Sequence, residues 1–500
     1  MPGSSRRPRP TLPAQPGAHR PARGRVAALA RPRAAGRTGA RMARAVAFVA
    51  GLAVAPALLA QDGAPKSTPL DALVETGLRQ NLSRRQQLLA VEQADAAVRE
   101  ARGLYLPSAT LNARYTELAG NTVDLGTLIN PAFGALNQLL QRPAFPTNID
   151  MRLPLRQETT VRLAQPIFQP SIIAANRVQS ALADAQGAQR DVQARQLTAD
   201  IKSGYLTFAK VQQVVALYDS TLPLLDEQVR VSERLVQAGK ATPDMILRAR
   251  AERSDVQQRR DESVQLAEAS REVLNLLLNR PLDTEVAIIP GSALGFDSLP
   301  ALDVLRREAA SGREELRQVA HARRAVSAQE RLAQGSFLPS LSVAVDYGVQ
   351  GKDYRLDRSR DFAALTVAVS WNLFNGGQDA ARIQQASLDG RRLELQRQEL
   401  EQRIALDVTT AWQGAAVARS AIRTADDRLQ SAKRTFELVR RKQEEGAASQ
   451  LEFLDARTAF TSAALNRVIT RYDYYLRRVA LERAAASYNL TRGAGGVGRR

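Results

Sequence analysis

The sequence lacks cysteine entirely and contains only two histidines. Without cysteine the chain cannot form a disulfide, a thiolate metal site or a cysteine nucleophile. It also lacks the lipidated N-terminal cysteine of a bacterial lipoprotein. His19 lies in an N-terminal leader, and His321 falls in a predicted helix, where we expect it to be solvated. The sequence contains no zinc motif, nucleotide-binding loop or nucleophile elbow, so we predict a protein that is not an enzyme and has no catalytic residue, metal or cofactor.

Acidic residues are missing from residues 1–60, which hold eleven arginines. This segment accounts for much of the formal net charge of +19, and the rest of the chain has a charge of only +8. A basic surface can indicate a nucleic-acid partner. Because most of the excess charge lies in a leader, we predict no nucleic-acid partner.

The leader has the features of an exported protein. Residues 1–41 are rich in proline, arginine and glycine and are expected to be disordered, and Met42 is the expected start of translation. A charged start at Met42, an apolar run at 45–57 and small residues before Gln61 predict a secretory signal cleaved near Ala60. A membrane anchor is the alternative, but the run is shorter than the roughly 20 residues that a spanning helix needs. Since no later apolar run is long enough either, a mature chain that crosses a membrane must use strands.

The rest of the chain repeats one plan twice. Each copy contains an aromatic-Leu-Pro-Ser turn, Tyr105–Ser108 in the first and Phe337–Ser340 in the second. Alternating strand-like segments follow, and then a helical stretch of 68 residues, which would be about 100 Å long. Each long helix ends at a glycine, Gly239 or Gly446, which we interpret as a helix C-cap. Tyr205 and Trp412 occupy corresponding positions.

These patterns predict two structural repeats, 61–300 and 301–491, and a disordered tail, 492–500. The first repeat is expected to open with a helix at 70–101 and to contain a long loop at 118–157 and a linker at 280–300. The predicted strands are 110–117, 159–168, 341–349 and 362–374. The predicted long helices are 171–238 and 378–445, and the predicted return helices are 243–279 and 449–487.

The predicted strands have one apolar and one small or polar face, which leaves two interpretations. The apolar residues expected to face lipid are Val343, Val345, Tyr347, Val367, Val369 and Trp371. Such strands can line a water-filled barrel in a membrane, but a half-buried soluble sheet gives the same alternation. The export signal and the long helices favour the membrane. Four strands are too few for a conducting barrel, whereas three chains would supply twelve.

The duplicated order of helix, strand, strand, helix and helix, together with the two Leu-Pro-Ser turns, resembles the outer-membrane efflux (TolC) family over about residues 65–490. The glycine-centred turns at 238–242 and 445–449 support the same resemblance. The fold class implied is mainly α with a membrane β-barrel: a homotrimer with a 12-stranded barrel in the lipid of the cell outer membrane and a long α-helical tunnel in the periplasm. The implied function is export with two partners, a periplasmic adaptor and an inner-membrane pump.

The resemblance also implies roles for the two helix turns. Residues at the periplasmic tips would bind the adaptor; these are Gly239, Lys240, Ala241, Thr242, Gly446, Ala447, Ala448 and Ser449. In the family's founding member, two acidic residues after the second tip glycine narrow the periplasmic entrance. Glu452 and Asp455 match both offsets, and a trimer would collect six carboxylates into a cation-selective ring. The first repeat has Met245 at the corresponding position. The alternative is a solvated helix face with acids near its N-terminus.

Two other functions remain open from the sequence. A coiled-coil scaffold of the envelope without a pore would explain the helices but would not need matched alternation in both pairs of strands. Secretion of proteins would use the same channel as efflux of drugs or metals. The sequence identifies neither the substrate nor the partners.

Overall fold

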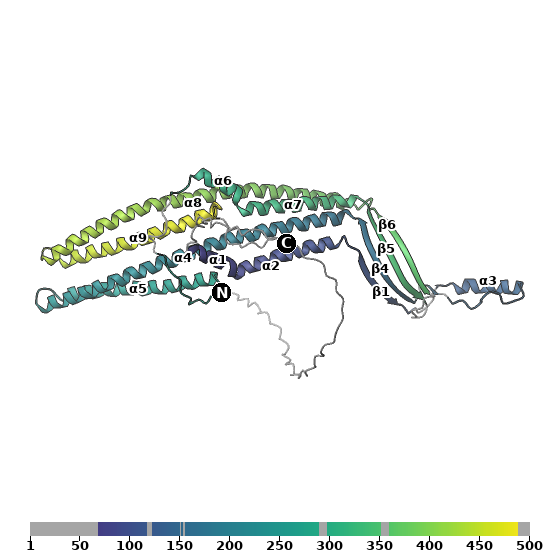
Figure 1. Ribbon diagram of the computed structural model, residues 1–500, viewed down its shortest axis with the longest axis horizontal. Helices are drawn as coiled ribbons and strands as arrows, with labels where there is room; N and C mark the ends of the chain where they lie inside the picture. Colours follow the sequence, from purple (N-terminus) through teal and green to yellow (C-terminus); the bar gives the residue numbers. More distant parts are fainter. Residues whose placement is uncertain are drawn as a thin grey trace, which may run out of the picture. The chain divides into compact units, whose positions relative to one another are not determined.

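The computed structural model describes residues 69–117, 123–150, 152–153, 156–289, 298–351 and 360–488, all within one structural unit (Figure 1). The predicted leader, signal peptide and tail lie outside the described residues, as does part of the predicted linker. The helices are α1 Pro69–Gln80, α2 Leu82–Gly103, α3 Gly126–Leu139, α4 Pro170–Gln237, α5 Asp244–Leu277, α6 Leu302–Gly312, α7 Glu314–Gln334, α8 Gln378–Glu444 and α9 Gln450–Ala484, with a 3₁₀ turn η2 at Gly335–Phe337. The strands are β1 Ser108–Tyr115, β2 Val123–Asp124, β3 Arg152–Leu153, β4 Gln157–Phe168, β5 Ser340–Gly351 and β6 Asp361–Ser370.

Two long helices, α4 and α8, organise the helical part (Figure 1). Helix α4 starts directly after β4 with Pro170 in its first turn, a position where the missing N–H of proline costs nothing. It remains helical past Pro223. Each long helix packs against the return helix that follows it, α4 against α5 and α8 against α9. Nearer the sheet, the order of contacts is α2, α4, α7, α8. No helix in the described part of the chain is long and apolar enough to cross a membrane.

A four-stranded antiparallel sheet joins the two repeats. Its strand order is β1-β4-β5-β6, so one hairpin from each repeat contributes two strands and β4 pairs with β5 at the centre. The register places Leu163 opposite Val345, and Val345 opposite Leu365. Because alternate residues of a strand point to opposite faces, one row of partners fixes the faces of the other paired residues, up to the irregularity between Pro166 and Phe168 in β4.

A buried tyrosine cluster joins the two repeats where α4 meets α9. Tyr205, Tyr472 and Tyr474 are fully buried, and burial raises the pKa of Tyr472 to about 12. The Tyr205 hydroxyl accepts a hydrogen bond from the Ile289 backbone N–H at 2.8 Å. In the second repeat, the indole of Trp412 donates to the Pro300 carbonyl at 3.0 Å. The matched aromatic positions therefore hold the connecting segments against the long helices.

The prediction of one helix at 70–101 is wrong, because the chain breaks at Asn81. The Asn81 side chain accepts a hydrogen bond from the Arg84 backbone N–H at 3.1 Å and so caps α2. Its amide also donates to the Leu277 carbonyl at 2.9 Å, which ties the break to α5. The apolar spacing continues across this position, so hydrophobic periodicity alone gave no sign of the break. Asparagine is a favoured N-cap residue, so Asn81 itself was the sequence signal for the start of a second helix.

The prediction that residues 118–157 form a long loop is also wrong, because this segment contains α3 and the β2–β3 pair. Two asparagines clamp α3 to the extended chain that follows it. Asn130 exchanges two hydrogen bonds with Ile149, each 2.8 Å long. Asn137 does the same with Phe145, at 2.6 and 2.8 Å. Pro131 and Gly134 favour a loop in the sequence, but both lie inside α3. The hydrogen bonds of the two asparagine side chains stabilise the helix locally.

Candidate functional site

The sheet has one apolar face that no described residue covers. In the direction across the strands, Leu111 pairs with Val161, Val161 with Tyr347, and Val343 with Val367. These side chains, with Leu163, Val345, Leu365 and Val369, lie on one face. Leu365 is 71% exposed, Val367 63% and Tyr347 55%. A contiguous exposed apolar surface of this kind marks contact with lipid or with another protein.

The opposite face of the same sheet is polar and carries its own ion pairs. Arg162 lies opposite Asp346, with 3.7 Å between their charged atoms. Arg114 on β1 donates to Glu158 on β4 at 2.6 Å. Thr110 and Thr366 share this face. The sheet can therefore separate an apolar medium from water, as a membrane strand does.

Aromatic side chains gather where the strands meet the helices. Trp371 lies one residue beyond the end of β6, so the predicted strand 362–374 is too long at its C-terminal end. The Trp371 side chain is exposed, and its indole N–H donates to the Phe337 carbonyl at 3.1 Å. Tyr105, Phe168 and Phe337 are also exposed at this junction. Exposed aromatics of this type are enriched at membrane–water interfaces.

The two glycine turns have the same backbone geometry. Gly239 has φ of +67° and Gly446 φ of +76°, a region that favours glycine because it has no Cβ. Lys240 N–H donates to the Leu235 carbonyl at 2.9 Å, and Gly239 N–H to the Val236 carbonyl at 3.0 Å. In the second turn, Ala447 N–H donates to the Lys442 carbonyl and Gly446 N–H to the Gln443 carbonyl. Both turns are Schellman motifs, and the interpretation of both glycines as helix C-caps is confirmed.

The predicted tip residues lie together within each turn and are accessible. Ala241 and Ala448 are half-buried, and the other six are exposed: Gly239, Lys240, Thr242, Gly446, Ala447 and Ser449. No described atom lies within contact distance of a Cβ placed at Gly239 or Gly446. The Thr242 hydroxyl donates to the Asp244 carboxylate, which fixes the start of α5. Both turns therefore expose backbone groups and mostly short side chains, together with the longer side chain of Lys240 in the first turn.

The predicted gate residues lie in the first two turns of α9, three residues apart, and both are exposed. Glu452 completes a capping box with Ser449. The Ser449 N–H donates to the Glu452 carboxylate at 3.0 Å, and the Glu452 N–H donates to the Ser449 hydroxyl at 3.2 Å. The sequence signal for this capping box is the pattern Ser-x-x-Glu at residues 449–452. In one subunit, Glu452 thus stabilises a helix start, and a ring with Asp455 would need further subunits.

A buried charge beside the predicted gate residues could not be identified from the sequence. Arg457 follows Asp455 by two residues on α9, and its side chain is only 4% exposed. Its guanidinium lies 3.4 Å from the Glu252 carboxylate on α5, which also accepts a hydrogen bond from Thr458. Burial lowers the pKa of Arg457, and Glu252 opposes that effect. This pair links the return helices of the two repeats close to the predicted gate residues. It had no sequence signal because its members are far apart in the chain.

The comparisons with known proteins first concern the fold. The chain is similar to the open state of the Neisseria gonorrhoeae MtrE outer membrane channel, with a TM-score of 0.68 and 18% identity over 83% of this chain and 88% of that chain. It is also similar to the outer membrane protein VceC from Vibrio cholerae, with a TM-score of 0.66 and 16% identity over 83% and 95% of the two chains. At these identities the likeness establishes the fold. No curated protein matches the chain.

A family model matches part of the chain directly. Residues 305–487 match the family model described as outer membrane efflux protein. The match covers essentially the second repeat, so this part of the chain is similar to an outer membrane efflux protein domain. The mainly α fold class is confirmed by these structures, and the family match over the second repeat supports the predicted resemblance.

Proposed function

We propose that this protein is a passive exit duct of the outer membrane, formed by three copies of the chain. Substrates would be delivered by an inner-membrane pump through a periplasmic adaptor, and the duct itself would perform no chemistry. The observation that carries the proposal is the sheet with one exposed apolar face and one polar face. The family match of residues 305–487 supports the efflux class.

The trimer follows from the strand count. The described sheet has four strands and two edges, β1 and β6. Exposed edges with unpaired backbone groups are not tolerated in lipid. Pairing β6 of one copy with β1 of the next would satisfy both edges, and three copies would give a twelve-stranded barrel wide enough to conduct. A scaffold without a pore would have no use for the uncovered apolar face.

The tips are the proposed contacts with the adaptor. Lys240, Thr242 and Ser449 are exposed at the ends of the helical hairpins, at the opposite end of the long helices from the sheet. If the sheet lies in the outer membrane, these tips are the part of the chain that reaches furthest toward the inner membrane.

Single-channel recording on the purified protein tests the proposal. We expect the protein in detergent to have the mass of three chains and to produce discrete, cation-selective conductance steps in a planar lipid bilayer. A monomer that is soluble without detergent would contradict the proposed trimer. A trimer that inserts into the bilayer but gives no conductance steps would contradict the proposed duct and favour the scaffold.

A further inference from the structure

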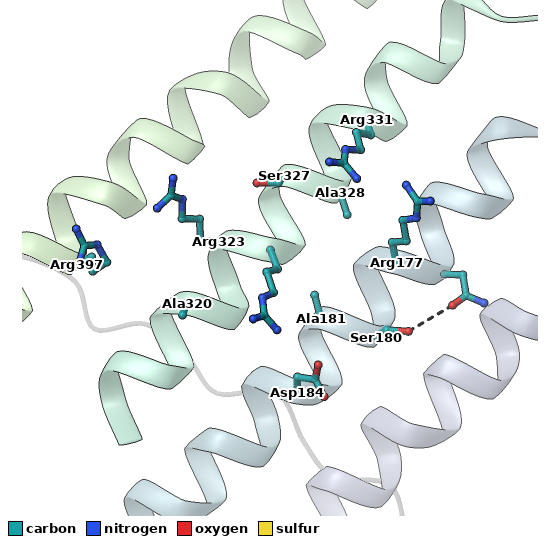
Figure 2. A pocket seen from close by; sticks show the side chains of 12 residues that line it. Arg177, Ser180, Ala181, Asp184, Ala320, Arg323, Ser327, Ala328, Arg331 and Arg397 are labelled. Carbon is teal, nitrogen blue, oxygen red and sulfur yellow. Dashed lines mark hydrogen bonds between the residues drawn. The ribbon is translucent and has the colours of Figure 1, made fainter. Parts of the chain in front are cut away.

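An arginine-lined groove runs between α4 and α7 near their sheet-proximal ends (Figure 2). Its volume is about 620 Å³, and α8 contributes one residue at its side. Five arginines line it, while Asp184 is the only acidic lining residue. The arginines are Arg177 on α4, Arg323, Arg324 and Arg331 on α7, and Arg397 on α8.

Two of these arginines form ion pairs with a described carboxylate, and three do not. Glu394 lies 2.8 Å from both Arg323 and Arg397, so that part of the groove is paired. No described carboxylate forms an ion pair with Arg177, Arg324 or Arg331. Asp184 lies 3.8 Å from the His321 ring. Figure 2 shows Arg177 and Arg331 at the same level on facing helices. Like charges that converge from two helices favour an anion between them.

Neutral hydrogen-bonding groups add to the same groove. Asn176, Ser180 and Ser327 line it beside the arginines, and the Ser180 hydroxyl lies 3.3 Å from the Asn176 amide oxygen. Guanidinium groups present paired donors that match the oxygens of a phosphate group. Hydroxyl and amide groups can donate to the remaining oxygens. The lining therefore suits a phosphate group better than a simple halide.

The groove lies in the middle of the helix layer rather than at a subunit seam. The layer order near the sheet is α2, α4, α7, α8, so the outer helices of each copy are α2 and α8. In the proposed trimer, neighbouring copies would meet at those outer helices. The contact between α4 and α7 would remain open to a ligand.

The sheet end of the groove lies just beyond the expected headgroup region. Arg177 follows the start of α4 by seven residues, or about 10 Å of helix, and Arg331 lies three residues before the end of α7. The exposed aromatics Phe168 and Phe337 lie at the junction with the sheet. Headgroup regions extend roughly 5–8 Å beyond each side of the hydrocarbon, so the backbone at Arg177 would lie just outside them. Basic residues just outside a membrane segment are typical of contacts with anionic lipids.

We propose that Arg177, Arg324 and Arg331 form a binding site for a phosphate group, and that an anionic phospholipid of the periplasmic leaflet supplies it. The lipid source rests on the proposed membrane orientation, whereas the site for phosphate itself does not. A free phosphate or a phosphorylated solute would use the same side chains.

Binding measurements on the full-length trimer in detergent test the site. One arm titrates short-chain phosphatidylglycerol against short-chain phosphatidylcholine, and the second titrates inorganic phosphate at constant ionic strength. The variant is Arg177→Gln with Arg324→Gln and Arg331→Gln. The matched control is Arg248→Gln with Arg259→Gln and Arg392→Gln, which removes the same charge from exposed positions elsewhere on the helices.

We expect the groove variant to lose at least about tenfold in affinity for phosphatidylglycerol, and the control to retain it. A loss confined to the inorganic phosphate arm would support the phosphate site and reject the lipid source. Equal losses in variant and control, or no binding by the unaltered trimer in either arm, would overturn the proposal. Conductance of the groove variant is recorded in parallel. If the groove variant conducts normally but no longer binds the ligand, the proposed duct is intact and only the binding site has been lost.

Discussion

Replacing Glu452 by Gln together with Asp455 by Asn is expected to raise single-channel conductance severalfold and to weaken the preference for cations. In the proposed trimer these residues form six carboxylates around one pore, and such rings select cations by their field. The substitution removes the charges and nearly preserves the side-chain volumes. Glutamine also fits the capping box with Ser449, so the start of α9 should remain intact.

The matched control lies in the turn of the first repeat. Asp244→Asn removes an exposed carboxylate from the first turn of α5, the helix that corresponds to α9. We expect that variant to keep the conductance and ion preference of the unaltered protein. The ring assignment would be untenable if the double substitution left currents and reversal potentials unchanged, because the acids would then be no more than a solvated helix start.

Replacing Val367 by Arg is expected to prevent the protein from assembling in the membrane. Val367 is 63% exposed on the apolar face, opposite Val343. An arginine on the lipid face of a membrane strand costs about 2–4 kcal/mol near the centre of the bilayer, and a trimer would incur that cost three times. The yield of heat-resistant trimer in outer-membrane fractions measures the effect.

The adjacent residue provides the comparison for this prediction. Thr366 lies on the polar face, opposite Ala344, so Thr366→Arg should be accepted by a water-filled interior. Both variants add the same side chain to the same strand at nearly the same depth. Equal yields for the two would contradict the assignment of the faces, and a loss specific to Thr366→Arg would reverse it.

The sequence predicted the features that depend on local residue types. Gly239 and Gly446 were identifiable because a C-cap with positive φ favours glycine. The alternation of Val343, Val345 and Tyr347 with small residues predicted the two faces, and the register agrees with it. These signals extend over a few residues and require no knowledge of the tertiary structure.

Features that depend on contacts between distant segments could not be predicted in this way. From the sequence alone, the Arg457 side chain is expected to be solvated. In the structure it is buried beside Glu252, which lies on another helix. Arg177 and Arg331 belong to different repeats, and only the packing of α4 on α7 brings them together. Helix α3 was mistaken for a loop because Pro131 and Gly134 outweighed the asparagine clamps, which can be recognised only in the folded structure.

The most direct test of the central claim asks what each face of the sheet touches. The natural chain has no cysteine, so single cysteines at Leu365 and at Ala364 can each carry one fluorophore without competing sites. Leu365 lies on the apolar face and Ala364 on the polar face, opposite Asp346. In reconstituted vesicles we predict that a lipid-borne quencher dims the label at position 365 and that a water-soluble quencher dims the label at position 364. Quenching of both labels by the water-soluble reagent alone would contradict a sheet that lies in lipid.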